Sequence, residues 1–299
     1  MSRARLPILV GLGLIVAGSV VYALDSWRSE SRNTKIDYVL KNARSITTID
    51  VPALENGELV IASDVPLPGE PLVDPDLGIS VEALGYSRSV QILQWRETET
   101  TTDDRTEYHY RKEWVNRPIS SSLFHESHRY RNRGSLPFRN LNIKPETISL
   151  GDLKLDNAYH SNFSSSSRFR LSREMYDELP AHYRSRFYVS EGGGLVSSRF
   201  PDIGDVRVKF STVEPRQVTV VGAFQDGSIV PAQTEAGEVA LLVQGNLSLD
   251  ELAATEKQSN RNVGMFLKIV AGLLAVGGIV LTIMGARISR SSLPNRPAY

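Results

Sequence analysis

The sequence predicts a membrane-anchored α+β protein in which two transmembrane helices flank a large, mainly β extracytoplasmic domain. Three observations lead to this fold class. Two long apolar segments lie near the two ends of the 299-residue chain. All 34 acidic residues lie between these segments, from Asp25 to Glu256. Several stretches of this middle part alternate apolar and polar residues with the two-residue period of a half-buried strand.

The first apolar segment covers residues 6–24 and carries no charge before Asp25 ends it. A helix needs about 20 apolar residues to cross a bilayer core of about 30 Å, and this segment has that length. A cleaved signal peptide is the alternative, because Val21, Tyr22 and Ala23 form an acceptable cleavage site. The apolar core of a signal peptide has roughly 7–15 residues, so the longer run favours an uncleaved anchor.

The second apolar segment covers residues 264–286, with Lys268 as its only charge. Lys268 lies about one helical turn into the segment, where its long side chain can reach the membrane interface. A buried core helix is the alternative. The length of the segment and the arginine-rich sequence behind it favour a transmembrane helix.

Basic residues beside both segments predict their orientation, since positively charged flanks stay in the cytoplasm. Arg3 and Arg5 precede the first segment, and Arg287, Arg290 and Arg296 follow the second. Both termini are therefore expected in the cytoplasm. The expected division is a cytoplasmic N-terminus at 1–5, a transmembrane helix at 6–24, an extracytoplasmic domain at 25–263, a second transmembrane helix at 264–286 and a basic cytoplasmic tail at 287–299.

Both apolar segments carry small residues at four-residue spacing, a pattern that lets helices approach closely in lipid. The pairs are Gly13 with Ala17, Ala271 with Ala275, and Gly278 with Thr282. One interpretation is that the two helices pack together, or that copies of the chain form a homo-oligomer, through these residues. The other is that small residues are simply frequent in membrane helices.

The middle domain is predicted to contain strands at 58–62, 89–96, 108–114, 206–210, 217–221 and 238–243. The second and third are expected to form a hairpin around a turn at Asp103 and Asp104. The strands at 206–210 and 217–221 are expected to pair with each other, and 238–243 to add a third strand there. Turn signals at Asp226-Gly227 and Ala236-Gly237 separate these strands.

Helices are expected to be fewer. Residues 25–40 extend the first apolar segment outward as a stalk. Ser248 and Glu251 form a capping box, which opens a polar helix that continues into the second apolar segment. Residues 172–186 are a weaker helical candidate, broken at Pro180, and the proline-rich residues 66–75 are expected to form an ordered loop or linker.

Few residues point to chemistry. The chain has no cysteine, which excludes disulfides, Cys-zinc sites and thiol nucleophiles. His125 and His128 are three residues apart, which is not the spacing of an HExxH metal site, so no metal is expected. The sequence contains no G-x-S-x-G elbow, phosphate loop or dinucleotide fingerprint, and glycines 192–194 fit a flexible turn. No cofactor is expected.

Arg129, Arg131, Arg133 and Arg139 form a basic cluster with aromatic residues between them. Such a composition also suits nucleic-acid binding, but an extracytoplasmic domain does not meet cytoplasmic nucleic acid. The favoured interpretation is a strand with a solvated basic face. A contact with anionic lipid headgroups or with a partner is the next.

The chain resembles the transmembrane protein 43 (LUMA) family. The resemblance rests on Asp-Leu-Gly-Ile at 76–79, on Arg-Ser-Val-Gln-Ile-Leu-Gln-Trp-Arg-Glu at 88–97, and on Phe-Pro-Asp-Ile-Gly-Asp-Val-Arg-Val-Lys-Phe at 200–210. It implies a first membrane helix, a large luminal domain and C-terminal membrane helices. It also implies scaffolding of membrane proteins, self-association and, in eukaryotic members, partners of the nuclear lamina, and it supplies no catalytic residue. Other membrane proteins are a further expected class of partner.

The expected function is therefore that of a non-enzymatic, self-associating membrane scaffold in contact with the lipid bilayer. An extracytoplasmic sensor or ligand-binding module is the alternative, and an exported hydrolase using His125 or His128 ranks below it. The animal members of the family have several C-terminal membrane helices and this sequence shows one. We therefore expect a short, bacterial member in the inner membrane with a periplasmic domain. In a eukaryote, the endoplasmic reticulum or the inner nuclear membrane is expected instead.

Overall fold

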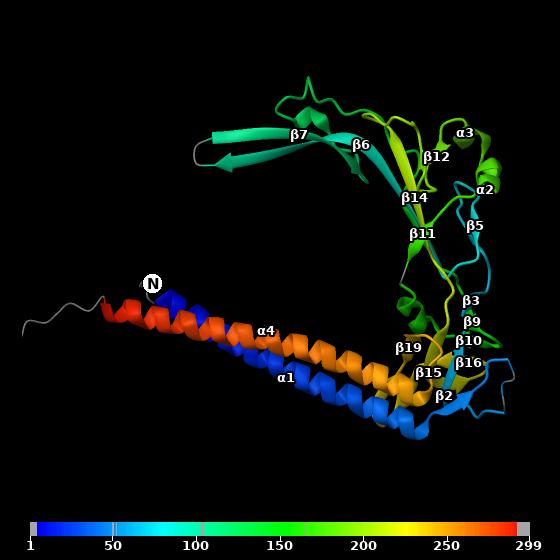
Figure 1. The fold of residues 1–299 in the computed structure, drawn as a ribbon, viewed down its shortest axis with the longest axis vertical. Helices are drawn as coiled ribbons and strands as arrows, with labels where there is room; N and C mark the ends of the chain where they lie inside the picture. The colour runs from blue at the N-terminus through cyan, green and yellow to red at the C-terminus, as the bar shows by residue number, and fades with distance from the viewer. Residues whose placement is uncertain (1–4, 50, 52, 103–104, 165, 292–299) are drawn as a thin grey trace, which may run out of the picture.

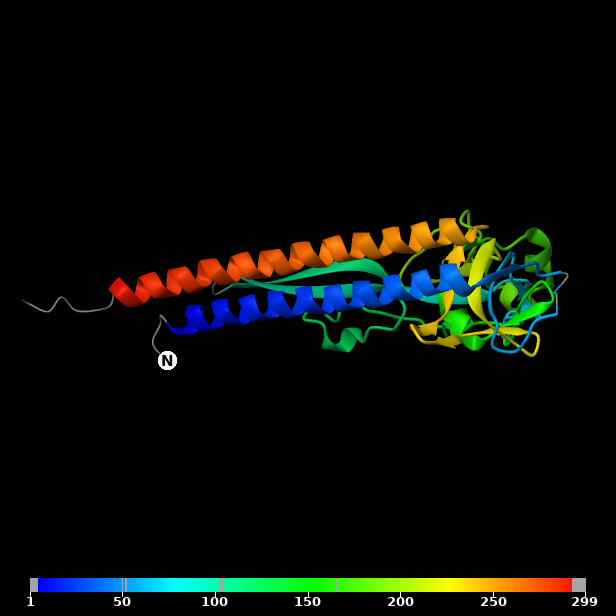
Figure 2. The same cartoon turned by 90° about the horizontal axis from the view of Figure 1, so that it is seen from below.

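The computed structural model describes residues 5–49, 51, 53–102, 105–164 and 166–291. It confirms the predicted fold class, because two long apolar helices near the ends of the chain pack together and flank a mainly β domain (Figure 1). The helices are α1 (Arg5–Asn42), α2 (Arg173–Glu178), α3 (Ala181–Arg184) and α4 (Leu249–Ser291), with 3-10 helices η1 (Ser121–Leu123) and η2 (Asn157–Asn162). Figure 2 shows α1 and α4 side by side, with the domain at one end of the pair.

An eight-stranded sheet lies beside the domain end of the helix pair (Figure 1). Its strands, in spatial order, are β1 (Arg44–Ile46), β2 (Leu59–Asp64), β15 (Val218–Gln225), β16 (Ser228–Val230), β10 (Leu153–Leu155), β9 (Ile148–Leu150) and β3 (Leu67–Pro68), with β19 (Leu241–Gln244) also on β15. The pairs β1–β2 and β10–β16 are parallel. The predicted turn at Asp226 and Gly227 is confirmed: both residues have positive φ, at 48° and 77°, as a two-residue hairpin turn requires.

A seven-stranded sheet forms the part of the domain farther from the helices (Figure 1). Its strands are β12 (Tyr188–Val189), β13 (Leu195–Val196), β14 (Val206–Val213), β6 (Gly85–Thr102) and β7 (Arg105–Val115), with β11 (Ser167–Phe169) on β14 and β8 (Leu141–Ile143) on β6. Two short hairpins complete the domain, β4 (Leu72–Val73) with β5 (Ser80–Val81) and β17 (Ala232–Thr234) with β18 (Gly237–Val239).

The predicted hairpin of the middle domain is confirmed as β6–β7, whose register runs from Ile92 opposite Val115 to Thr102 opposite Arg105. Its predicted turn residues, Asp103 and Asp104, lie outside the described residues. The outer part of this hairpin leaves the sheet and runs in the same direction as α1 and α4 in both views (Figures 1 and 2).

The predicted pairing of strands 206–210 and 217–221 is wrong. These strands are β14 and β15, which follow each other in the chain but lie in different sheets. β14 alternates buried residues with half-buried or exposed ones and pairs with β6, whereas the first six residues of β15 are all buried. A strand buried on both faces needs a central position with both faces covered, and β15 has it between β2 and β16.

Three further expectations for local structure hold with adjustments. The predicted strand at 238–243 is divided at Ala240 into β18, which pairs with β17, and β19, which pairs with β15. The candidate helix at 172–186 is divided near Pro180 into α2 and α3. The proline-rich residues 66–75 contain the two short strands β3 and β4.

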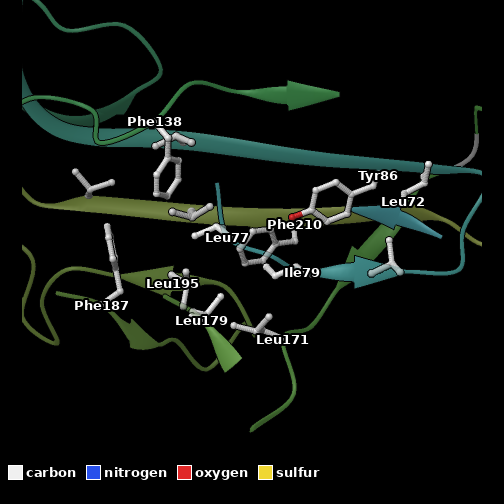
Figure 3. Packing of buried hydrophobic residues seen from close by; sticks show 14 of the residues in the cluster. Leu72, Leu77, Ile79, Tyr86, Phe138, Leu171, Leu179, Phe187, Leu195 and Phe210 are labelled. Atoms are coloured by element: carbon white, nitrogen blue, oxygen red, sulfur yellow. The ribbon is translucent and has the colours of Figure 1, made fainter. Parts of the chain in front are cut away.

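The core of the seven-stranded sheet lies on the face covered by α2, α3 and the β4–β5 hairpin (Figure 1). Figure 3 shows Tyr86 of β6 close to Phe210 of β14, and their rings stack with centroids 6.2 Å apart. Val90 and Ile92 of β6 are buried in the same cluster. The alternation of β6 thus turns every second side chain inward.

Arg88 lies on this inward face of β6, although it is charged. Its side chain is 2% exposed and pairs with Asp74 and Asp76, and its guanidinium lies 4.4 Å from the centroid of the Phe138 ring. Tyr86 donates a hydrogen bond of 2.9 Å to Asp74. Burial, together with the neighbouring Asp74 carboxylate, raises the pKa of Tyr86 well above its usual range. The positive charge of Arg88 is thus balanced within the core by the carboxylates of Asp74 and Asp76.

The helix pair is joined to the eight-stranded sheet by a separate apolar cluster. Val39 of α1 and Leu252 of α4 are buried against Leu59 of β2 and Val221 of β15. Because both helices contribute to the cluster, the domain is fixed to the pair and not to one helix alone. The capping box that opens α4 is confirmed, with Ser248 N donating to Glu251 over 2.9 Å.

Candidate functional site: the membrane helix pair

The two long helices are long enough to cross a bilayer and still extend beyond it. α1 has 38 residues and α4 has 43, whereas about 20 residues span the hydrocarbon core. Both contain a stretch apolar enough for a membrane span. Apolar side chains there, including Leu12, Val16 and Leu273, are about half exposed or more, as expected for side chains that face lipid. The predicted stalk at 25–40 is confirmed as the continuation of α1.

Within the apolar part, glycines allow the two helices to touch. A Cβ atom added at Gly18 would lie 2.7 Å from the carbonyl oxygen of Ala271. One added at Gly278 would lie 2.5 Å from the carbonyl oxygen of Gly11. Real Cβ atoms do not come this close, so larger residues would push the helices apart. Gly11 and Gly18 thus face the opposite, antiparallel helix.

The small residues singled out in the sequence are divided between two faces. Ala271 and Gly278 are buried in the contact and Ala275 lies partly in it, whereas Gly13 and Ala17 are exposed. An added Cβ at Gly13 would meet nothing within 4 Å. The two glycines of α1 in the contact, Gly11 and Gly18, are spaced by seven, not four. Residues seven apart lie on the same side of a helix in a packed pair. This spacing is the feature of the sequence that indicates which side of α1 contacts α4.

The part of the pair between the apolar segments and the domain is held by polar groups. The Nδ2 atom of Asn260, a residue that is 2% exposed, donates to the backbone oxygen of Ser29 at 3.0 Å and to Asn33 Oδ1 at 3.1 Å. Arg32 pairs with Glu256 at 2.7 Å. We call residues 25–42 of α1 and 249–264 of α4 the stalk; the hydrophobic pattern of the sequence did not predict its hydrogen bonds.

At the boundary between stalk and apolar part, the Asp25 side chain is buried against Gly264 of α4. One carboxylate oxygen accepts a hydrogen bond of 2.8 Å from Arg28. A Cβ atom at position 264 would lie 3.2 Å from the other carboxylate oxygen, so the glycine provides the space for Asp25. The charge that ends the first apolar segment thus lies within the helix contact.

The basic cluster takes a different form from the one expected. Arg129, Arg131, Arg133 and Arg139 lie in an irregular segment between η1 and β8, so the expectation of a strand is wrong. All four side chains are exposed. Arg129 pairs with Glu126 at 3.5 Å, and Arg133 donates to the carbonyl oxygen of Ile203 at 2.9 Å. Hydrogen bonds from Asn132 to Trp95 and Ile119 hold this segment in a non-strand conformation.

His125 and His128 lie in one loop, whereas His160 lies in η2, a different element. The His125 ring stacks on Tyr108 of the β6–β7 hairpin with centroids 4.3 Å apart, and His128 is exposed in the same loop. His160 is in η2, where burial lowers its pKa. In the part of the chain that the structure describes, no group of three or more His, Asp or Glu side chains could hold a metal ion.

Comparison with known proteins agrees with the family resemblance noted in the sequence. The sequence model of the Transmembrane protein 43 family matches residues 92–293. The Transmembrane protein 43 homolog of Drosophila melanogaster is 25% identical over 294 residues, covering 93% of this chain and 77% of the relative. Transmembrane protein 43 of Rattus norvegicus and of Homo sapiens are each 28% identical over 211 residues, covering 63% of this chain and 51% of the relative.

The chain therefore spans about half the length of these two mammalian relatives. No solved structure matches the chain. The family match covers more than half of the sequence and includes the β6–β7 hairpin, β14 and all of α4. The chain belongs to the Transmembrane protein 43 family and is a membrane protein with two candidate membrane spans.

Proposed function

We propose that the protein is a non-enzymatic, self-associating membrane scaffold whose two helices cross the bilayer as one antiparallel unit. The main support is that one face of α1 is used within the chain and another is left open. Gly11 and Gly18 contact α4, whereas Gly13 and Ala17 are exposed. Small residues on a lipid-facing surface allow a second helix to approach closely. The open face is the candidate contact between copies.

The rigid attachment of the domain supports the same function. Both helices bury residues against β2 and β15, so an assembly of helix pairs in the membrane also arranges the β domains beside one another. The polar outer part of the β6–β7 hairpin and the exposed arginines at 129, 131, 133 and 139 are then surfaces for contacts with membrane-protein partners or lipid headgroups.

The orientation that follows from the basic flanks places both termini in the cytoplasm and the β domain on the other side. That side is the periplasm in the inner membrane of a bacterium and the lumen of the endoplasmic reticulum or nuclear envelope in a eukaryote. Because the chain has no cysteine, single introduced cysteines report the orientation directly. Ser122→Cys should react with a membrane-impermeant maleimide from outside, and Ser2→Cys only after permeabilisation. The reverse pattern would contradict this orientation.

Self-association is tested by native mass spectrometry of the full chain in mild detergent. The wild type should give dimers or larger assemblies, and the double variant Gly13→Leu with Ala17→Leu should shift the population toward monomers. Ala23→Leu is the matched control, because Ala23 is also exposed on α1 but lies on another side of the helix. A monomeric wild type, or equal assembly of all three proteins, would contradict the proposal.

A further inference from the structure

A cavity of about 620 Å³ opens on the outer face of the seven-stranded sheet, the face opposite its core. Three basic side chains line it, those of Arg168, Arg207 and Lys209, and we call it the cationic pocket. Serine hydroxyls and apolar side chains complete the lining, among them Ser89, Ser190, Ser211, Trp114, Val196 and Pro201. The volume lies within the range of roughly 300–1,000 Å³ that is usual for small-molecule sites.

Strand alternation and register gather the three basic residues. In β14, Val206, Val208 and Phe210 are buried in the core, so Arg207 and Lys209 project from the opposite face. β11 pairs with β14 so that Arg168 lies opposite Ser211. The pocket is therefore built on a rigid sheet by two strands that are well separated in the sequence.

The positive charge of the pocket is not balanced by its own lining, which includes no Asp or Glu. Over the described residues, neither Arg168, Arg207 nor Lys209 has an ion pair with an acidic side chain. Glu214 accepts a hydrogen bond of 3.0 Å from the lining residue Ser167, but it also lies 3.7 Å from Arg216. Although Lys209 is exposed, partial desolvation lowers its pKa, and the charges of Arg207 and Arg168 lower it further.

Arg207 is held in place without being neutralised. Its Nε atom donates to Gln91 Oε1 at 2.8 Å, and its guanidinium lies 4.5 Å from the Trp114 ring centroid. Burial lowers its pKa. Holding a partly desolvated guanidinium beside two further cations costs free energy, and a bound anion would reduce that cost. A plain solvated basic face needs neither the cavity nor the orienting contacts.

We propose that the cationic pocket binds a phosphate group, carried either by a phospholipid headgroup or by a small phosphorylated solute. Arginine is suited to phosphate because its planar guanidinium forms paired hydrogen bonds with two oxygens. The cavity is larger than a phosphate ion, and its apolar wall fits the carbon part of such a ligand. The outer face of the sheet is turned toward the side on which α1 and α4 extend (Figure 1).

The test uses the full chain in a neutral detergent, with glycerol 3-phosphate and dihexanoyl phosphatidylglycerol as probes in isothermal titration calorimetry. Binding of both probes with similar Kd identifies a soluble phosphorylated ligand. Binding of the lipid alone identifies a headgroup. In either case the double variant Arg168→Gln with Lys209→Gln should weaken binding at least about tenfold, since each charge-assisted hydrogen bond contributes about that factor.

Two controls make the result decisive. Both substituted side chains are exposed, so the double variant should keep the Tm of the wild type. Arg131→Gln removes an exposed arginine outside the pocket and should leave the Kd unchanged. The proposal is overturned if neither probe binds, or if the folded double variant binds as tightly as the wild type. These outcomes are independent of whether the protein self-associates.

Discussion

The apolar half of the helix pair and the stalk are held together by different forces, although the same two helices form both. In the apolar half, Gly11, Gly18 and Gly278 let the backbones touch. In the stalk, Asn260 and the ion pair of Arg32 with Glu256 join the helices through polar groups. In lipid there is no hydrophobic driving force for helices to associate. The apolar halves are therefore held together by close packing of the two helices. Water permits polar contacts and weakens them by competing for the same groups.

This difference between the apolar half and the stalk predicts the order in which substitutions lower thermal stability. A steric change in the apolar half should be costly, because two backbones in contact cannot relax around a new side chain. A polar change in the stalk should cost less, and the cost should fall as the affected groups become more exposed. Four substitutions, the first two each with a matched control variant, test this order by thermal unfolding of the full chain in detergent.

Gly18→Leu should have the largest effect. A Cβ atom alone would already lie 2.7 Å from the Ala271 carbonyl oxygen, and overpacking of this kind costs about 1–3 kcal/mol or more. The expected result is a clear loss of Tm, with weaker contact between the apolar halves. Gly272→Leu is the control, since Gly272 is exposed on α4 and nothing lies within 4 Å of an added Cβ there. Equal losses in both variants would contradict the assignment of the contact face.

Asn260→Leu should come next. The substitution removes the hydrogen bonds from Asn260 Nδ2 to Ser29 and Asn33 and leaves their acceptors partly buried, at a cost of about 1–3 kcal/mol. The control is Asn262→Leu, because Asn262 is exposed on the other side of α4. If Asn262→Leu lowers the Tm as much as Asn260→Leu, the amide contact is not what holds the stalk.

Glu256→Gln should lower the free energy of unfolding by about 1 kcal/mol. Glu256 is buried but its partner Arg32 is partly accessible, with a side-chain exposure of 42%. The glutamine keeps the shape and some of the hydrogen bonding, so only the charge is lost. The loss of Tm should shrink in high salt, since exposed ion pairs are screened. A loss that does not depend on salt would point to packing instead of charge.

Lys257→Ala should have the smallest effect, within about 0.5 kcal/mol. Its ion pair with Asp37, at 2.7 Å, joins two side chains that are 39% and 53% exposed. A larger loss than that of Glu256→Gln would reverse the expected order and show that exposure does not set the strength of the stalk contacts.

The sequence predicted most local structure because local signals determine it. The apolar segments, the capping box at Ser248 and the alternation of the β6–β7 hairpin are each visible within a few neighbouring residues. The sheet partners of β14 and β15 were not predictable in this way. Their choice depends on which faces other elements cover, and the short segment between them leads from one sheet to the other.

The same limit applies to the charged residues. The cluster of Arg129, Arg131, Arg133 and Arg139 is close in sequence, yet its residues lie in an exposed loop. Arg168 and Arg207 are far apart in sequence, and strand register alone brings them to one pocket. Arg88 did carry a signal, because it shares the inward alternation of Val90 and Ile92. An arginine at an inward position predicts a buried acidic partner.

Disulfide formation in native membranes tests most directly the claim that α1 has one face for its own chain and another for a second copy. The chain has no cysteine, so a single introduced cysteine can form a homodimer disulfide only with a second copy. Ala17→Cys should give disulfide-linked dimers under mild oxidation. Leu12→Cys, which is exposed to lipid on a different side of α1, should give few. Equal crosslinking of both variants, or none from Ala17→Cys, would contradict the account.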